Sequence, residues 1–88
     1  MVSRKVTIVN MTGLHLRPTK NLCQEAVLFK SSVTFVFHGT EVNAKSVLSV
    51  LGAGVNRGDE ILLQCRGEDE EEALEKLAAY IENGLGTD

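Results

Sequence analysis

His15 lies in a short run whose residue types suit the transfer of an anionic group. It falls within Gly13–Pro18, where a glycine leads into a predicted helix. Pro18 suits a first helical turn, because its missing N–H would have no partner there anyway. The free N–H groups of such a turn attract anions and favour an uncharged imidazole with a nucleophilic nitrogen. If that nitrogen accepted a phosphoryl group, the Arg17 guanidinium would bind its oxygens through charge-assisted hydrogen bonds.

The spacing alone leaves a second interpretation of His15 open. A lone histidine beside a helix start is more often an ordinary cap or surface residue. The sequence also lacks a Gly-x-x-x-x-Gly-Lys phosphate loop and a carboxylate cluster suited to Mg²⁺, both of which an independent phosphotransferase would use. Any phosphoryl group that reaches His15 must therefore come from a partner protein.

Apolar spacing predicts the strand and the helix that flank His15. Val2, Val6 and Ile8 alternate with polar residues, which indicates a half-buried strand over about residues 2–9. Apolar residues then recur at helical spacing, which indicates a helix over about residues 16–29. His15 is thus expected at the junction between a loop and the start of this helix.

The middle of the chain predicts a hairpin and a short helix. Within residues 33–43, side chains alternate along two short runs on either side of Gly39. This pattern indicates two antiparallel strands with His38 solvated at their turn. Ser46 is followed by a cluster of apolar residues, so its hydroxyl is expected to cap a helix of barely two turns. That helix is expected to end at Gly52 or Gly54.

The last part of the chain predicts a fourth strand over residues 61–66 and a longer final helix. Asp69, with Glu72 three residues later, suggests an N-terminal cap. Gly84 is expected to stop the helix. Its apolar stripe comprises Leu74, Leu77, Ala78, Ile81 and Leu85. The element order is β-α-β-β-α-β-α, which favours an α+β fold with one antiparallel sheet covered on one side by helices.

Length and composition fit a single domain over residues 1–88. Hydrophobic residues make up 43% of the chain and charged residues 24%, which argues against disorder or a fibrous repeat. The net charge of -3 is unevenly divided. Residues 1–57 carry a net +5 and residues 58–88 a net -8. The basic half contains His15, so it is the part suited to phosphate and to acidic partners.

The sequence also bears on compartment and cofactors. Since no apolar run approaches the roughly 20 residues that span a bilayer, we expect a cytoplasmic protein without direct membrane insertion. Cys23 and Cys65 show no metal-ligand spacing, and we expect two reduced thiols that act as small apolar residues. A disulfide between them is the alternative. No metal or other cofactor is expected.

Two distant motifs closely resemble those of HPr, the histidine-containing phosphocarrier of the bacterial phosphoenolpyruvate-dependent sugar phosphotransferase system. They are the run Gly13–Pro18 and the run Lys45–Leu48. The resemblance covers essentially the whole chain, including Asn43–Ser46 and the acidic start of the last helix. It implies an open-faced β-sandwich, in which a four-stranded antiparallel sheet carries three helices on one face.

The resemblance also implies roles for particular residues. His15 would accept a phosphoryl group through Nδ1 from enzyme I, itself charged by phosphoenolpyruvate, and pass it to A-type domains of sugar permeases. Arg17 would stabilise the phosphate. The chain would be a stoichiometric carrier and not an enzyme. Ser46 matches a site that a dedicated kinase phosphorylates in many bacteria, so a regulatory phosphosite is expected there in addition to the helix cap.

The same resemblance suggests a docking surface and its partners. A serine kinase/phosphorylase and a transcription regulator are candidate partners besides enzyme I and the permease domains, and the chain is expected to be a monomer. An apolar patch ringed by basic side chains would suit an acidic, partly hydrophobic groove. The expected docking residues are Leu16, Lys20, Lys45, Val47, Leu48 and Leu51. Some of these leucines are alternatively core residues.

Two departures from the commonest family pattern keep other functions in view. Leu16 replaces a usually small residue after the histidine, and Thr19-Lys20 replaces a usually small pair. These changes favour, as an alternative, a regulatory or nitrogen-branch paralogue that acts mainly by docking. A small nucleic-acid-binding domain is disfavoured, because only the basic first half supports it and no aromatic stacking pattern is present.

Overall fold

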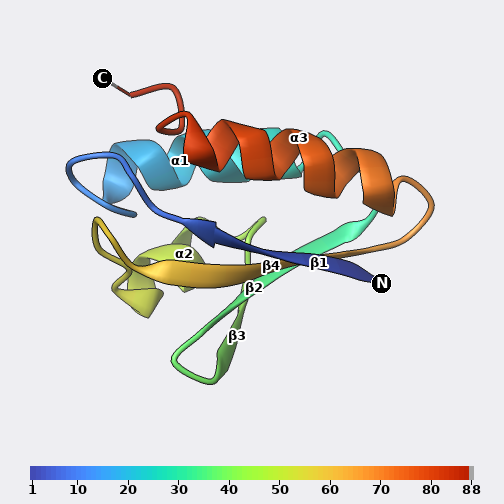
Figure 1. The fold of residues 1–88 in the computed structure, drawn as a ribbon, viewed down its shortest axis with the longest axis horizontal. Coiled ribbons are helices and arrows are strands. Elements are labelled where there is room, and N and C mark those ends of the chain that lie inside the picture. The colour runs from blue at the N-terminus through green and yellow to red at the C-terminus, as the bar shows by residue number, and fades with distance from the viewer. Residues whose placement is uncertain (88) are drawn as a thin grey trace.

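The computed structural model describes residues 1–87 and places three helices with one four-stranded antiparallel sheet (Figure 1). The elements are β1 (Val2–Thr7), α1 (Leu16–Ala26), β2 (Ser32–Phe37), β3 (Thr40–Asn43), α2 (Val47–Ala53), β4 (Glu60–Arg66) and α3 (Glu70–Glu82). The strands lie in the order β1-β4-β2-β3. The predicted element order and the α+β class are confirmed.

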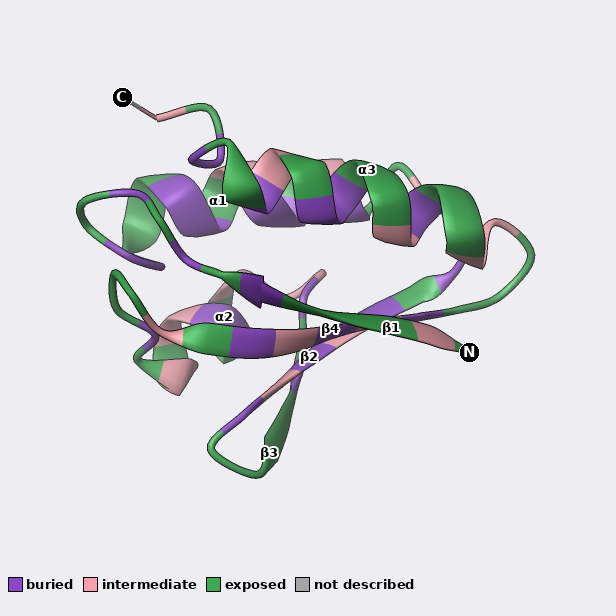
Figure 2. Cartoon of the chain, viewed as in Figure 1, coloured by how far each residue is buried: buried purple, intermediate pink, exposed green. Residues whose placement is uncertain are grey.

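The core lies between the sheet and the helices, as the alternation within the strands predicts. Phe35 of β2 pairs with Leu63 of β4, and both side chains are fully buried. On the other face of the same strands, the Thr34 hydroxyl donates to the Gln64 side-chain oxygen at 3.2 Å. Figure 2 shows the corresponding pattern in α3, where buried and exposed positions alternate around the helix. Each fully buried large apolar side chain contributes about 1.5–3 kcal/mol.

Both cysteines belong to this core as free thiols, so the disulfide alternative is wrong. Burial raises the pKa of the Cys23 thiol. Burial, reinforced by the carboxylates of Asp69 and Glu70, raises the pKa of the Cys65 thiol to about 11. The predicted behaviour as small apolar residues is confirmed, since both thiols are buried and disfavoured as thiolates.

Both β1 and α1 are shorter than predicted. β1 ends at Thr7, because Ile8 exchanges backbone hydrogen bonds with the turn at Gly58 and Asp59 and leaves the sheet. Helix α1 ends at Ala26 and not near residue 29. After that point the chain forms a tight turn in which the Leu28 side chain is 71% exposed.

The Asp69 side chain fixes the position of the segment that follows α1. Its carboxylate accepts hydrogen bonds from the backbone N–H groups of Lys30 and Ser31, both at 2.9 Å, and from the Ser31 hydroxyl. These contacts join the end of the turn after α1 to the start of α3. The Ser31 hydroxyl bond, with the backbone N–H of Lys30, lowers the pKa of Asp69 to about 2.

The start and end of α3 differ from prediction in detail. Asp69 occupies the N-cap position, but its side chain caps no helical N–H because it is engaged with Ser31. Glu70 instead accepts a hydrogen bond from the backbone N–H of Gly67 at 3.1 Å. The sequence predicts Leu85 on the helical stripe, yet α3 ends at Glu82 and a turn with positive φ carries Leu85 into the core. Among residues 1–87, no helix is both long enough and apolar enough to cross a membrane.

Candidate functional site

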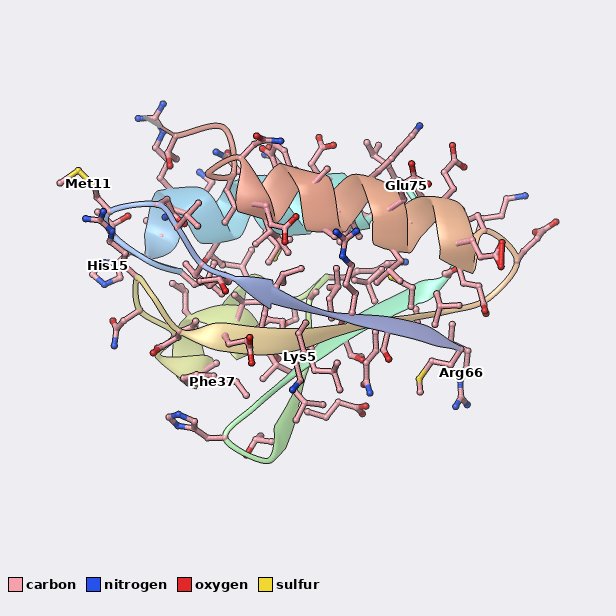
Figure 3. All side chains as sticks on the ribbon, in the orientation of Figure 1. Lys5, Met11, His15, Phe37, Arg66 and Glu75 are labelled. Atoms are coloured by element: carbon pink, nitrogen blue, oxygen red, sulfur yellow. The ribbon has the colours of Figure 1, made fainter. Side chains whose placement is uncertain are left out.

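His15 stands at the start of α1 with its side chain exposed. Its backbone is extended, with φ -76° and ψ -174°, and its carbonyl accepts the first helical hydrogen bond from the Thr19 N–H at 2.9 Å. His15 occupies the N-cap position of α1, but its imidazole makes no capping hydrogen bond to the helix. Figure 3 shows the ring at the surface, at the same end of the molecule as Met11. The ring is therefore accessible to a partner.

The loop before His15 is held by backbone contacts that require a glycine. Gly13 has φ +63°, and a Cβ atom there would lie 2.7 Å from both the Val55 carbonyl oxygen and the Asn56 Cα. The next residue, Leu14, donates its N–H to that same Val55 carbonyl at 2.9 Å. Buried Asn10 donates its side-chain amide to the Gly13 carbonyl at 2.7 Å. The position of His15 is thus fixed against the segment that follows α2.

Within residues 1–87, the first N–H groups of α1 have no hydrogen-bond partner. Because Thr19 is the first residue to donate within the helix, the N–H groups of Leu16 and Arg17 precede the helical ladder. No acidic side chain lies in this first turn. Together with the positive end of the helix dipole, this arrangement favours an anion bound beside His15.

A depression of about 320 Å³ lies beside His15. Its lining comprises Thr12, His15, Arg17, Pro18 and Thr87. The structure thus brings His15 and Arg17 together as the sequence predicts, and Pro18 is buried in the first turn. Within residues 1–87 the Arg17 guanidinium forms no ion pair, which leaves it available to a phosphate.

Thr12 and Thr87 were missed from the sequence. Thr12 immediately precedes Gly13, so its place in the same loop was a usable signal. Thr87 comes from the other end of the chain and no local pattern pointed to it. Met11 was also missed, although it is 68% exposed at the same end of the molecule as His15.

The expected docking residues fall into exposed and half-buried groups. Leu16 and Leu48 are 58% and 83% exposed, values that indicate surface and not core leucines. Lys20 is exposed, while Val47 and Leu51 are half-buried. A shallow depression of about 210 Å³ joins the first and second helices and is lined by Lys20, Cys23, Gln24, Val27 and Val47. The roles of these residues in docking remain predictions.

Lys45 has a structural contact that the sequence did not predict. Its side chain is half-buried, and its Nζ donates to the Phe29 carbonyl at 2.9 Å. Phe29 follows the C-terminal end of α1, whereas Arg17 lies in its first turn. The Lys45 ammonium therefore lies at the opposite end of α1 from the Arg17 backbone. In the basic ring that the sequence predicts around the docking patch, Lys45 and Arg17 would therefore lie at opposite ends of α1.

Ser46 caps α2 as predicted. Its Oγ accepts a hydrogen bond from the Ser49 backbone N–H at 3.2 Å, and Gly54 follows the last residue of α2 as the C-cap with a left-handed φ of +69°. Val50, on the inner side of this helix, is fully buried. The cap interpretation is confirmed, and a second role as a phosphosite remains a prediction.

The family comparison agrees with the motif that carries His15. A family model described as the PTS HPr component phosphorylation site matches residues 2–83. The HPr-like protein Crh of Bacillus subtilis is 46% identical over 82 residues, which are 93% of this chain and 96% of that protein. Phosphocarrier protein HPr of Xylella fastidiosa is 36% identical and covers 100% of this chain and 99% of its own.

Solved structures show the same fold. HPr of Thermoanaerobacter tengcongensis superposes with a TM-score of 0.95 at 36% identity, covering 100% of this chain and 99% of its own. The crystal structure of Bacillus subtilis Crh gives a TM-score of 0.77 at 44% identity, covering 99% of this chain and 100% of its own. That crystal is described as an intertwined dimer with a swapped domain.

Proposed function

The chain belongs to the HPr family of phosphocarrier proteins of the phosphotransferase system, and we propose that His15 is the residue that carries the phosphoryl group. One observation carries this assignment. The exposed imidazole shares a depression with Arg17 and lies at the N-terminus of α1, where N–H groups that no other described residue binds favour an anion.

The transfer needs a nucleophilic ring nitrogen and a place for the incoming charge. Nδ1 of His15 attacks the phosphorus atom carried by enzyme I, and a new N–P bond forms as the bond to the donor atom breaks. The electron pair of the broken bond returns to the donor. The Arg17 guanidinium and the N–H groups of the first turn then stabilise the phosphoryl oxygens. Transfer to an A-type permease domain runs through the same steps with this chain as donor.

The chain supplies an acceptor and leaves the rest of the machinery to its partners. Members of this family interact with the enzymes of the phosphotransferase system. We assign enzyme I as the donor and A-type domains of sugar permeases as the acceptors, with the chain acting as a monomeric, stoichiometric carrier in the cytoplasm. Its two free buried thiols suit a reducing compartment.

The docking face extends from the start of α1 toward α2. Exposed Leu16 and Leu48 supply apolar contact, and exposed Lys20 supplies positive charge. An acidic groove with an apolar floor on the partner would complement both. Because Leu16 is adjacent to His15, docking through it would bring the phosphorylated group of the partner close to the imidazole.

Phosphotransfer from phosphoenolpyruvate tests this function. With purified enzyme I and labelled phosphoenolpyruvate, we expect about one acid-labile phosphate per chain and transfer of that phosphate to an A-type domain. Absence of label would contradict the proposal. Growth of a carrier-deficient strain on a fermentable sugar distinguishes the sugar system from a regulatory paralogue, because restored growth at the normal rate supports a sugar-system carrier. A labelled chain that restores no growth would favour the paralogue.

Replacing Ser46 by aspartate is expected to slow phosphorylation of His15 by enzyme I by about tenfold. The change places a negative charge beside the docking face while preserving a side chain that can cap α2. A tenfold effect corresponds to about 1.4 kcal/mol of lost complementarity with an acidic partner. The measurement is kcat/KM of enzyme I for each variant as phosphoryl acceptor.

Ser46→Asn is the matched control, because asparagine caps helices as well as serine does and adds no charge. We expect this variant to accept phosphate at the rate of the unmodified chain. If Ser46→Asp were also unchanged, Ser46 would be a helix cap without regulatory effect on enzyme I.

A further inference from the structure

The segment after α3 folds back as a compact turn, which we call the C-terminal turn, Gly84–Thr87. The Thr87 backbone N–H and hydroxyl both bond to the Gly84 carbonyl, at 3.0 and 2.7 Å. Leu85 is fully buried and donates its N–H to the Tyr80 carbonyl at 3.0 Å. Figure 1 shows this segment bending from the end of α3 toward the end of the molecule where α1 begins.

One side chain of α1 holds this turn. Half-buried Asn21 donates its side-chain amide to the Leu85 carbonyl at 2.8 Å. A Cβ atom at Gly86 would lie 3.1 Å from the Tyr80 hydroxyl and 3.6 Å from the Asn21 amide nitrogen, so the turn fits closely against both. The C-terminal turn is therefore attached to the same helix that begins at His15.

This attachment places Thr87 in the depression around the imidazole, together with Thr12, Arg17 and Pro18. We propose that Asn21 is a positioning residue that holds the C-terminal turn as a wall of this depression, and that the wall slows hydrolysis of the phosphorylated His15. The inference rests on the proposed function of His15 and adds a reason for the long-range contact between α1 and the end of the chain.

The protected step is the loss of phosphate to water. The oxygen of a water molecule attacks the phosphorus, and the P–Nδ1 bond breaks with its electron pair left on the nitrogen. One proton of the water goes to Nδ1, and the hydroxyl remains on the released inorganic phosphate. A fixed wall restricts the directions from which water can reach the phosphorus. A carrier benefits because its phosphate must persist until an acceptor docks.

Hydrolysis of the isolated phosphorylated chain tests the role of Asn21. After labelling and removal of enzyme I, we expect Asn21→Ala to lose acid-labile phosphate about fivefold faster than the unmodified chain. That factor corresponds to about 1 kcal/mol, the typical net contribution of one hydrogen bond. Thr87→Gly removes the lining side chain directly and is expected to accelerate hydrolysis as well. The Thr87 amide resonance of the first variant reports whether the turn has moved.

Asn83→Ala is the matched control, since Asn83, the C-cap residue of α3, also donates its side-chain amide to a backbone carbonyl, that of Ala79 in the same helix at 2.8 Å. We expect its hydrolysis rate to equal that of the unmodified chain. Equal rates in Asn21→Ala and the unmodified chain would overturn the proposal, whether or not the Thr87 resonance moves. This outcome would leave the proposed carrier function intact, whereas an unmodified chain that accepts no label would contradict that function itself.

Discussion

Replacing His15 by alanine is expected to abolish phosphoryl transfer from enzyme I to this chain. The imidazole is the nucleophile of the proposed reaction, and the methyl group of alanine offers no nitrogen to form the N–P bond. The side chain is exposed, so its loss opens no cavity and the fold is expected to persist. The measurement is the amount of acid-labile label per chain after incubation with labelled phosphoenolpyruvate and enzyme I.

His38→Ala is the control for this experiment, because His38 is the other histidine of the chain and is also exposed. It lies in the turn between β2 and β3, where its ring stacks on Phe37 with centroids 3.9 Å apart. We expect this variant to accept a full equivalent of phosphate. Acid-labile label that persists in His15→Ala would place the acceptor on another residue and refute the assignment.

Gly13→Ala is expected to have the largest effect on stability near the site, about 2–4 kcal/mol. The left-handed backbone costs a residue with a side chain about 1–2 kcal/mol, and the added Cβ would also overlap backbone atoms of Val55 and Asn56. Relief of that overlap must shift the loop that carries His15. The free energy of unfolding in urea measures the first effect, and the rate of phosphorylation by enzyme I measures the second.

Gly54→Ala separates the two causes. Gly54 has a similar φ of +69°, but a Cβ there would meet no atom within 4 Å. We expect a loss of only about 1–2 kcal/mol, which represents the backbone conformation alone. If the two variants lost equal stability, the close approach of Gly13 to the segment after α2 would have no energetic consequence.

Most of the fold was predictable because its burial follows local periodicity. The alternation that buries Phe35 and Leu63 can be read from each strand separately. Ser46 marks the start of α2 because its own side chain caps that helix. Such features depend on residues within a few positions of one another. The element order can therefore be predicted from these features without knowing which elements pack together.

The ends of the elements were less predictable because distant contacts set them. Helix α1 stops at Ala26, and the next segment is held by Asp69, almost forty residues later. The same contact removes Asp69 from the capping role that its position suggested. Lys45 likewise bonds the Phe29 carbonyl instead of remaining free. A side chain that bonds a distant backbone group leaves no periodic signal in the sequence.

The candidate site divides in the same way. His15 and Arg17 lie within one short run, so their neighbourhood was predictable from a helix start. Thr87 comes from the C-terminal turn, which the Asn21 hydrogen bond and the buried Leu85 attach to the rest of the fold. The part of the site proposed to bind the phosphoryl group is thus local, while the part proposed to shield it depends on the whole fold.

Phosphorus-31 NMR of the chain after incubation with phosphoenolpyruvate and enzyme I tests the central claim most directly. We predict one signal from phosphohistidine, substituted at Nδ1 and bonded to His15, which disappears after brief exposure to acid. A signal from phosphoserine, from histidine substituted at Nε2, or no protein-bound signal at all would contradict the proposal that His15 carries phosphate through Nδ1.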